Sequence, residues 1–216
     1  PKPLSNDIYY LFTVTANGSF DGFNVYTIDM SLNGGNGQLI DEDGDGVFFS
    51  ELQGGQWSEK VAAVKGQECN TFWVVTAFNN EFFSYKVDEN GVNETPVISA
   101  VSTAINNRGY LKLSPDGTKL AVANQGTLGF NGTPNSSIIY NFDNLTGIVE
   151  NDETFLIDGF DDGQAYGIEF SVDSNKLYIS TVSGFRYGLV GWTPPFPGAN
   201  TNPVTYKLFQ YDLTAT

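Results

Sequence analysis

Hydrophobic residues alternate with polar or small residues over many short stretches of the chain, and this period of two predicts β-strands. The clearest stretch is Gly109–Asn124, where two alternating runs flank Pro115-Asp116-Gly117. Leu111 and Leu113 mark the apolar side of the first run. Proline fixes φ at the second position of a tight turn, and glycine accepts the positive φ that a later position needs. The stretch therefore predicts a β-hairpin with one buried face.

This hairpin has a near copy at Ala165–Thr181, which indicates a repeat. Two kinds of strand recur along the chain. Hydrophobic strands are expected at residues 9–14, 71–76, 119–124 and 176–181. Each is followed by a strand that ends in an aspartate, and these are Asp29, Asp88, Asp143 and Asp212, spaced by 59, 55 and 69 residues. Several short strands in each repeat of about this length are typical of propeller blades.

The fold class predicted is all-β, a β-propeller of about four blades. The blade parts are approximately 1–55, 56–104, 105–160 and 161–216. Innermost strands are expected at 58–64, 109–113 and 166–170, and outermost strands near 96–100 and 154–157. The first blade then lacks its innermost strand and the last blade its outermost. Because an open arc exposes apolar faces and strand edges, we expect a part of a larger, about seven-bladed propeller.

The composition agrees with this fold class and argues against one class of partner, nucleic acid. The 216 residues include 24 glycines, 14% aromatic residues and only 16% charged ones, as expected for β-structure with many turns. The formal net charge is −15 with 10 Lys and Arg, so nucleic acid is not an expected partner. No apolar run is long enough for a transmembrane segment.

Five side chains are assigned to packing on the basis of their neighbours. Trp57 and Trp73 lie beside or within expected strands, and Tyr85 and Tyr140 belong to the strands that end in aspartate. Cys69 is the single cysteine, so an intrachain disulfide is excluded, and the apolar residues after it predict a buried thiol.

Few residues suggest chemistry, since the chain has no histidine. This excludes Ser-His-Asp and Cys-His catalysis and metal sites with histidine ligands. Asp41, Asp43 and Asp45, with glycine at the sixth position, match the first half of a calcium loop. The acid expected at the twelfth position falls one residue early, at Glu51, and strands are expected at 38–40 and 47–49 rather than the helices of an EF-hand. The alternative to a calcium ion bound by this loop is a solvated acidic turn.

The loops between the second and third strands of each blade differ most. The second blade has only Asn79-Asn80, whereas the third and fourth have residues 125–135 and 183–203. In a propeller these loops share one face, where ligands usually bind. The candidate ligand-binding residues are Phe130, Phe185, Tyr187, Trp192 and Phe196. They are candidates for a protein- or glycan-binding platform, and the alternative is that they pack each loop onto its own blade.

Several segments together resemble a known propeller family. These are residues 1–14, Val25–Met30, Ser58–Val64, Gly109–Val122 and Ala165–Thr181. They resemble a WD40-like or lactonase-like repeat region of large secreted surface proteins from gliding-type Bacteroidota, which are cargo of type IX secretion. The resemblance implies a bacterial cell-surface location and further blades in the parent protein. It supplies no catalytic motif.

Three functions remain open. The first is a noncatalytic surface module that binds protein or glycan, which the absence of histidine favours over an enzyme. The alternative is a lactonase-like enzyme with a metal in the central channel, for which Glu169 and Asn107 beside innermost strands are the candidate residues. The third is a structural spacer, whose partners would be the neighbouring blades or domains of the parent protein.

Overall fold

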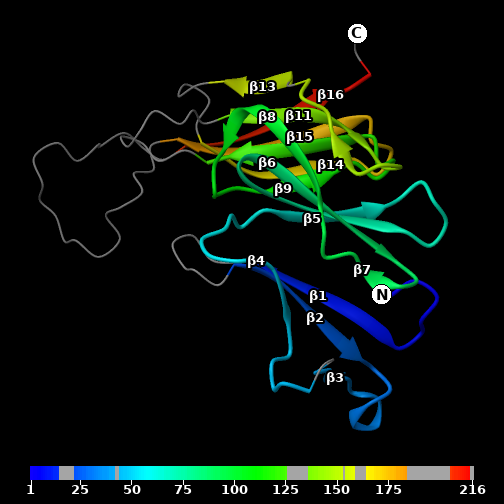
Figure 1. Cartoon of the computed structure of the whole chain (residues 1–216). Helices are drawn as coiled ribbons and strands as arrows, with labels where there is room; N and C mark the ends of the chain where they lie inside the picture. The colour runs from blue at the N-terminus through cyan, green and yellow to red at the C-terminus, as the bar shows by residue number, and fades with distance from the viewer. Residues whose placement is uncertain are drawn as a thin grey trace, which may run out of the picture.

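The computed structural model describes residues 1–14, 22–41, 44–125, 136–152, 154–158, 164–183 and 205–214. These residues form antiparallel sheets and one short 3-10 helix, η1 (Asn33–Gly35). Four sheets follow one another in chain order across the molecule, from β1 and β2 at one end to β16 at the other (Figure 1). Within the described ranges, no helix is long and apolar enough to cross a membrane.

The strands of each sheet are consecutive in the sequence. The first sheet contains β1 (Ile8–Val14), β2 (Phe23–Asp29), β3 (Gln38–Leu39) and β4 (Ser50–Gln53). The second contains β5 (Val61–Lys65), β6 (Phe72–Asp88), β7 (Gly91–Val92) and β8 (Val97–Ile105). The third contains β9 (Leu111–Leu113), β10 (Lys119–Asn124), β11 (Ser136–Asp143), β12 (Ile148–Val149) and β13 (Thr154–Asp158). The fourth contains β14 (Gln164–Phe170), β15 (Lys176–Ser183) and β16 (Thr205–Asp212).

The four antiparallel sheets confirm the predicted all-β, blade-like architecture. β5, β9 and β14 are the innermost strands, and each pairs with the hydrophobic strand that follows it. Among the described strands, none pairs with the other edge of β1 or of β16. In the second blade, one continuous strand, β6, takes the place of both middle strands. Its residues 72–76 pair with β5, and its residues 81–84 pair with β8. The predicted two-residue link lies at the change of partner, where Asn79 has φ 56°.

Alternation along the strands builds three cores, one between each pair of neighbouring sheets. On β6, Trp73 and Val75 face the third sheet, whereas Val74 faces the first. On β10, Leu120 faces the second sheet and Ala121 the fourth. Removal of apolar surface from water between these faces stabilises the fold by about 25 cal/mol per Å² buried. Each inner sheet is therefore covered on both faces.

The repeated aspartates have a structural explanation that the sequence reasoning did not supply. In every sheet the aspartate carboxylate at the end of β2, β6, β11 or β16 accepts the backbone amide two residues later, as expected for an Asx turn. The four N···O distances lie between 2.8 and 3.0 Å, for Asp29, Asp88, Asp143 and Asp212.

A second turn is copied in the same way. The Ser114 hydroxyl donates to Asp116 and accepts the Lys119 amide, at 2.6 and 2.9 Å. In the next sheet Ser171 makes the same bonds to Asp173 and the Lys176 amide, also at 2.6 and 2.9 Å. The Pro115-Asp116-Gly117 turn and its copy are therefore scaffold.

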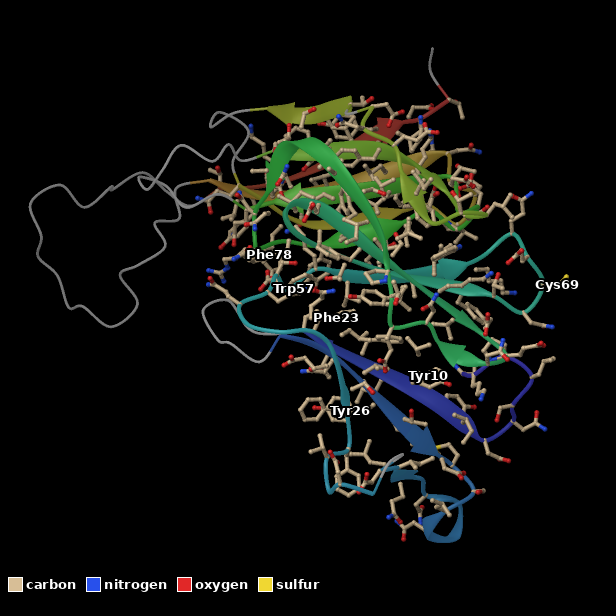
Figure 2. The ribbon with its side chains drawn as sticks, in the orientation of Figure 1. Tyr10, Phe23, Tyr26, Trp57, Cys69 and Phe78 are labelled. Atoms are coloured by element: carbon tan, nitrogen blue, oxygen red, sulfur yellow. The ribbon has the colours of Figure 1, made fainter. Side chains whose placement is uncertain are left out.

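The predicted packing residues Trp57, Trp73, Tyr85 and Tyr140 are confirmed as buried. Figure 2 shows Trp57 and Phe78 beside each other between the first two sheets, and their rings stack at 4.9 Å. The prediction of a buried Cys69 was wrong. Its side chain is exposed at the tip of the β5–β6 turn (Figure 2). The apolar residues that follow it belong to β6, whereas Cys69 itself precedes Asn70 in the turn, where φ is 58°.

Two strand predictions also need correction. Residues 47–49 are not a strand, and pairing starts only at Ser50, opposite Val25. Asp45 accepts the Val47 amide at 2.7 Å, which keeps this segment within the preceding turn. The innermost strand of the second sheet begins at Val61 rather than at Ser58. The strand expected at 38–40 is present as β3.

Candidate functional site

The antiparallel order gives the molecule two edges with different contents. When strands are counted from the innermost position of a blade, which the first sheet lacks, the turns after the first and third positions lie at one edge, here called the turn edge. The links after the second strands, and the connections between sheets, lie at the opposite edge, here called the loop edge. Asn124 and Ser136 pair there, as do Ser183 and Thr205. These are the strand ends next to the two long loops.

The predicted aromatic platform lies outside the described residues. This applies to Phe130, Phe185, Tyr187, Trp192 and Phe196. The platform therefore stays a prediction.

The acidic loop is described only in part, since Asp43 falls outside the described residues. The Asp41 carboxylate accepts the amides of Gly44 and Gly46, both at 2.8 Å. These bonds satisfy the turn with protein donors, which fits the alternative of a solvated acidic turn. The part of the chain that the structure describes holds no group of three acidic, cysteine or histidine side chains placed for a metal ion. Calcium binding stays a prediction.

Four side chains gather at the loop edge of the innermost strands, and we call them the inner-edge cluster. Glu59 precedes β5, Arg108 and Tyr110 precede β9, and Tyr166 belongs to β14, so three successive sheets contribute. The Glu59 carboxylate accepts the Gly109 amide at 2.8 Å. The rings of Tyr110 and Tyr166 lie 5.3 Å apart. Burial and the nearby carboxylate of Glu59 raise the pKa of the Tyr166 phenol, while Arg108 acts in the opposite direction.

The backbone holds this cluster in place across both seams between sheets. The Glu59 amide donates to the Asn107 carbonyl at 3.0 Å, and the Tyr110 amide donates to the Tyr166 carbonyl at 2.9 Å. Main-chain bonds of this kind set the spacing independently of rotamers, so the side chains are presented at defined positions. Tyr110 remains 48% exposed and is therefore accessible to a ligand.

Lys60 lies beneath the cluster and is fully buried. Its Nζ donates to the carbonyls of Arg108 and Gly109, at 2.5 and 2.9 Å. Burial lowers the pKa of Lys60 to about 7, and the charge of Glu59 opposes this only in part. These bonds link the second sheet to the third. Burial of an ammonium group without a carboxylate partner lowers the free energy of unfolding, so the link has an energetic cost.

The two candidate residues of the enzyme hypothesis have protein partners. Glu169 forms an ion pair with Lys112 at 2.8 Å, between neighbouring innermost strands. Asn107 offers its backbone carbonyl to Glu59. Sequence reasoning therefore named residues next to the cluster but missed its members. A usable signal was present, since charged or tyrosine residues stand directly before or at the start of each innermost strand.

Comparison with solved structures identifies the fold. The periplasmic gluconolactonase PpgL of Pseudomonas aeruginosa matches 80% of this chain with 19% identity and a TM-score of 0.51. The tricorn protease matches 97% with 14% identity and a TM-score of 0.44. Hsv2 of Kluyveromyces lactis matches 81% with 13% identity and a TM-score of 0.41. No protein-family model and no curated protein matches the sequence.

The four antiparallel sheets and the likeness to the gluconolactonase identify the chain as an all-β protein with the blades of a β-propeller. It spans 47% of the gluconolactonase chain, 17% of the tricorn protease and 45% of Hsv2. At these identities the likeness concerns the fold alone.

Proposed function

We propose that this chain is a noncatalytic β-propeller module of a larger protein exported to the bacterial surface, where it binds protein or glycan through its loop edge. The inner-edge cluster is the observation that carries the binding role. Tyr110 is exposed and Tyr166 is half-buried, and their rings, tilted by 52°, offer aromatic surface to a ligand. The Glu59 carboxylate beside them can accept hydrogen bonds and the Arg108 guanidinium can donate them. This combination is typical of surfaces that recognise sugars or peptides.

The test measures binding by the full chain, first on a glycan array and then with purified surface proteins of the source bacterium. Alanine at both Tyr110 and Tyr166 is expected to weaken the strongest interaction by at least about tenfold, since tyrosines that a ligand covers often dominate the binding energy. Tyr9→Ala is the matched control, because Tyr9 is similarly exposed, at 41%, but lies on β1 of the first sheet. Equal effects of the two changes would contradict a site at the inner edge.

Export rests on the family resemblance and on the strongly acidic surface, which keeps exported proteins soluble. Antibodies raised against the chain should label intact cells of the source bacterium without permeabilisation. Labelling only after lysis would refute the surface location and leave the binding site to be judged separately.

A further inference from the structure

Exposed apolar side chains concentrate in one short segment. Sixteen large hydrophobic side chains of the described residues are exposed, and six of them lie between positions 30 and 49. These six are Met30, Leu32, Leu39, Val47, Phe48 and Phe49. Scattered exposed apolar residues need no explanation, but a local concentration marks an interaction surface. The outer part of the first sheet is therefore unlike the rest of the surface.

Three of these residues line a groove of about 400 Å³ between the first sheet and the β6–β7 turn of the second. We call it the first-sheet groove and define it by Tyr10, Asp45, Val47, Phe48, Phe49 and Glu94. The volume is within the range of ligand-binding clefts. Glu94 follows the β6–β7 turn, so one wall of the groove lies at the turn edge, whereas the inner-edge cluster lies at the loop edge.

The apolar residues of the groove are held outward by the fold. Asp45 accepts the Val47 amide at 2.7 Å, which fixes the start of the segment. Phe49 contacts the ring of Tyr26, with centroids 5.6 Å apart. Even so, Phe48 and Phe49 are each 42% exposed. The groove is preformed, which lowers the entropic cost of binding.

Acidic residues outnumber basic ones around the groove. Residues 41–51 contain five acidic residues and no basic one, and residues 88–94 contain three acidic residues and no basic one. Lys2 is the single basic residue among those that line the groove. The formal charge of the chain, −15, adds to the same field. Anionic partners are repelled, and cations are attracted over about a Debye length.

We propose that the first-sheet groove binds a basic, apolar segment of a partner protein. Its lysine or arginine side chains would lie beside Asp45 and Glu94, and its apolar side chains would cover Phe48 and Phe49. Aromatic faces also attract cations, so the two kinds of contact reinforce each other. The first-sheet groove is separate from the proposed ligand site at the loop edge. A basic partner is inferred because it would complement the acidic residues around the groove.

The test uses the full chain and a fluorescent peptide of alternating lysine and leucine, followed by anisotropy at low and at high salt. One comparison peptide replaces lysine by glutamate, and another replaces leucine by serine. The lysine–leucine peptide should bind best, and its affinity should fall as salt rises. Phe48→Ser and Glu94→Lys are each expected to weaken binding by roughly tenfold.

Matched changes elsewhere separate a groove from general adsorption. Val172→Ser removes an apolar side chain that is 93% exposed, and Glu150→Lys makes the same charge change at an exposed site outside the groove. Both should leave affinity within about twofold of the parent chain. Circular dichroism should show that all four variants are folded. The proposal fails if Val172→Ser and Glu150→Lys act as strongly as the groove changes. It also fails if the lysine–serine peptide binds equally well.

Discussion

The turn edge and the loop edge are built from the same repeated sheets, yet they differ in how closely the repeats agree. At the turn edge, aspartates and serines recur with the same partners and nearly the same distances. At the loop edge, link lengths vary and Glu59, Lys60 and Arg108 have no copies with the same partners in the other described sheets. Agreement between repeats marks the scaffold, and departure from it marks the region in which to look for function.

The largest expected effect comes from glycines that close the two edges. Gly109 has φ +98°, and a Cβ there would lie 2.2 Å from the backbone oxygen of Ala123. Gly117 has φ +72°, and its Cβ would meet the movable side chain of Asn144. We expect Gly109→Ala to lower the free energy of unfolding by about 3 kcal/mol or more and Gly117→Ala by about 1–2 kcal/mol. Urea denaturation measures the free energy of unfolding of each variant. Equal losses in the two variants would contradict the expectation that Gly109 is the more sensitive position.

Lys60, at the loop edge, should make the free energy of unfolding of the chain depend on pH. Its pKa is lowered by burial to about 7 in the folded chain, against an ordinary value of 10.5. Between these values the unfolded chain binds more protons than the folded one, so stability should rise with pH, by at most about 1.4 kcal/mol per pH unit. Below pH 7 both states are protonated and this rise is absent.

The measurement is the free energy of unfolding from pH 6 to 9.5 for the parent chain and for Lys60→Met. The free energy of unfolding of Lys60→Met should rise much less with pH than that of the parent chain. The variant should also be less stable at every pH, because the Arg108 and Gly109 carbonyls lose their donor. A parallel pH dependence in both proteins would show that Lys60 is not the group responsible.

Removal of a turn-edge aspartate should cost stability and leave binding unchanged. Asp116 accepts the hydroxyls of Ser114 and Thr118, at 2.6 and 2.9 Å. Burial acts to raise the pKa of Asp116, but these hydrogen bonds outweigh it and the pKa is lowered. Its contribution is therefore complete above the ordinary pKa of about 4 and is lost as pH falls through the lower folded value.

Asp116→Ala should lower the free energy of unfolding by about 1 kcal/mol at pH 7. The gap to the parent chain should narrow toward pH 2, as followed by thermal unfolding. Binding at the inner-edge cluster should not change. A loss of binding with normal stability would mean that the turn edge takes part in recognition.

The smallest expected effect concerns the acidic loop of residues 41–46. Because Asp41 already accepts two backbone amides, we expect the turn to persist when calcium is removed. The melting temperature should then be the same in EGTA and in excess calcium. A rise with calcium that Asp43→Asn abolishes would instead establish the predicted ion, with Asp41, Asp43 and Asp45 as ligands.

Much of the fold could be predicted because its causes are local. The alternation at Leu111 and Leu113, and the turn chemistry of Pro115-Asp116-Gly117, placed strands and hairpins correctly. Residues 47–49 show the limit of this reasoning. They are apolar enough for a strand, but the preceding turn retains the Val47 amide, and pairing with Val25 starts only at Ser50.

The sequence by itself determined the β-structure, the repeat and the absence of histidine chemistry, since these depend on residue type and short-range spacing. Only the tertiary structure decided which distant residues meet. Glu59, Arg108 and Tyr166 come from three sheets and are brought together by backbone bonds across two seams. Burial of Lys60, exposure of Cys69 and the groove beside Phe48 likewise depend on how the sheets pack. Such contacts between distant residues leave no periodic pattern in a single sequence.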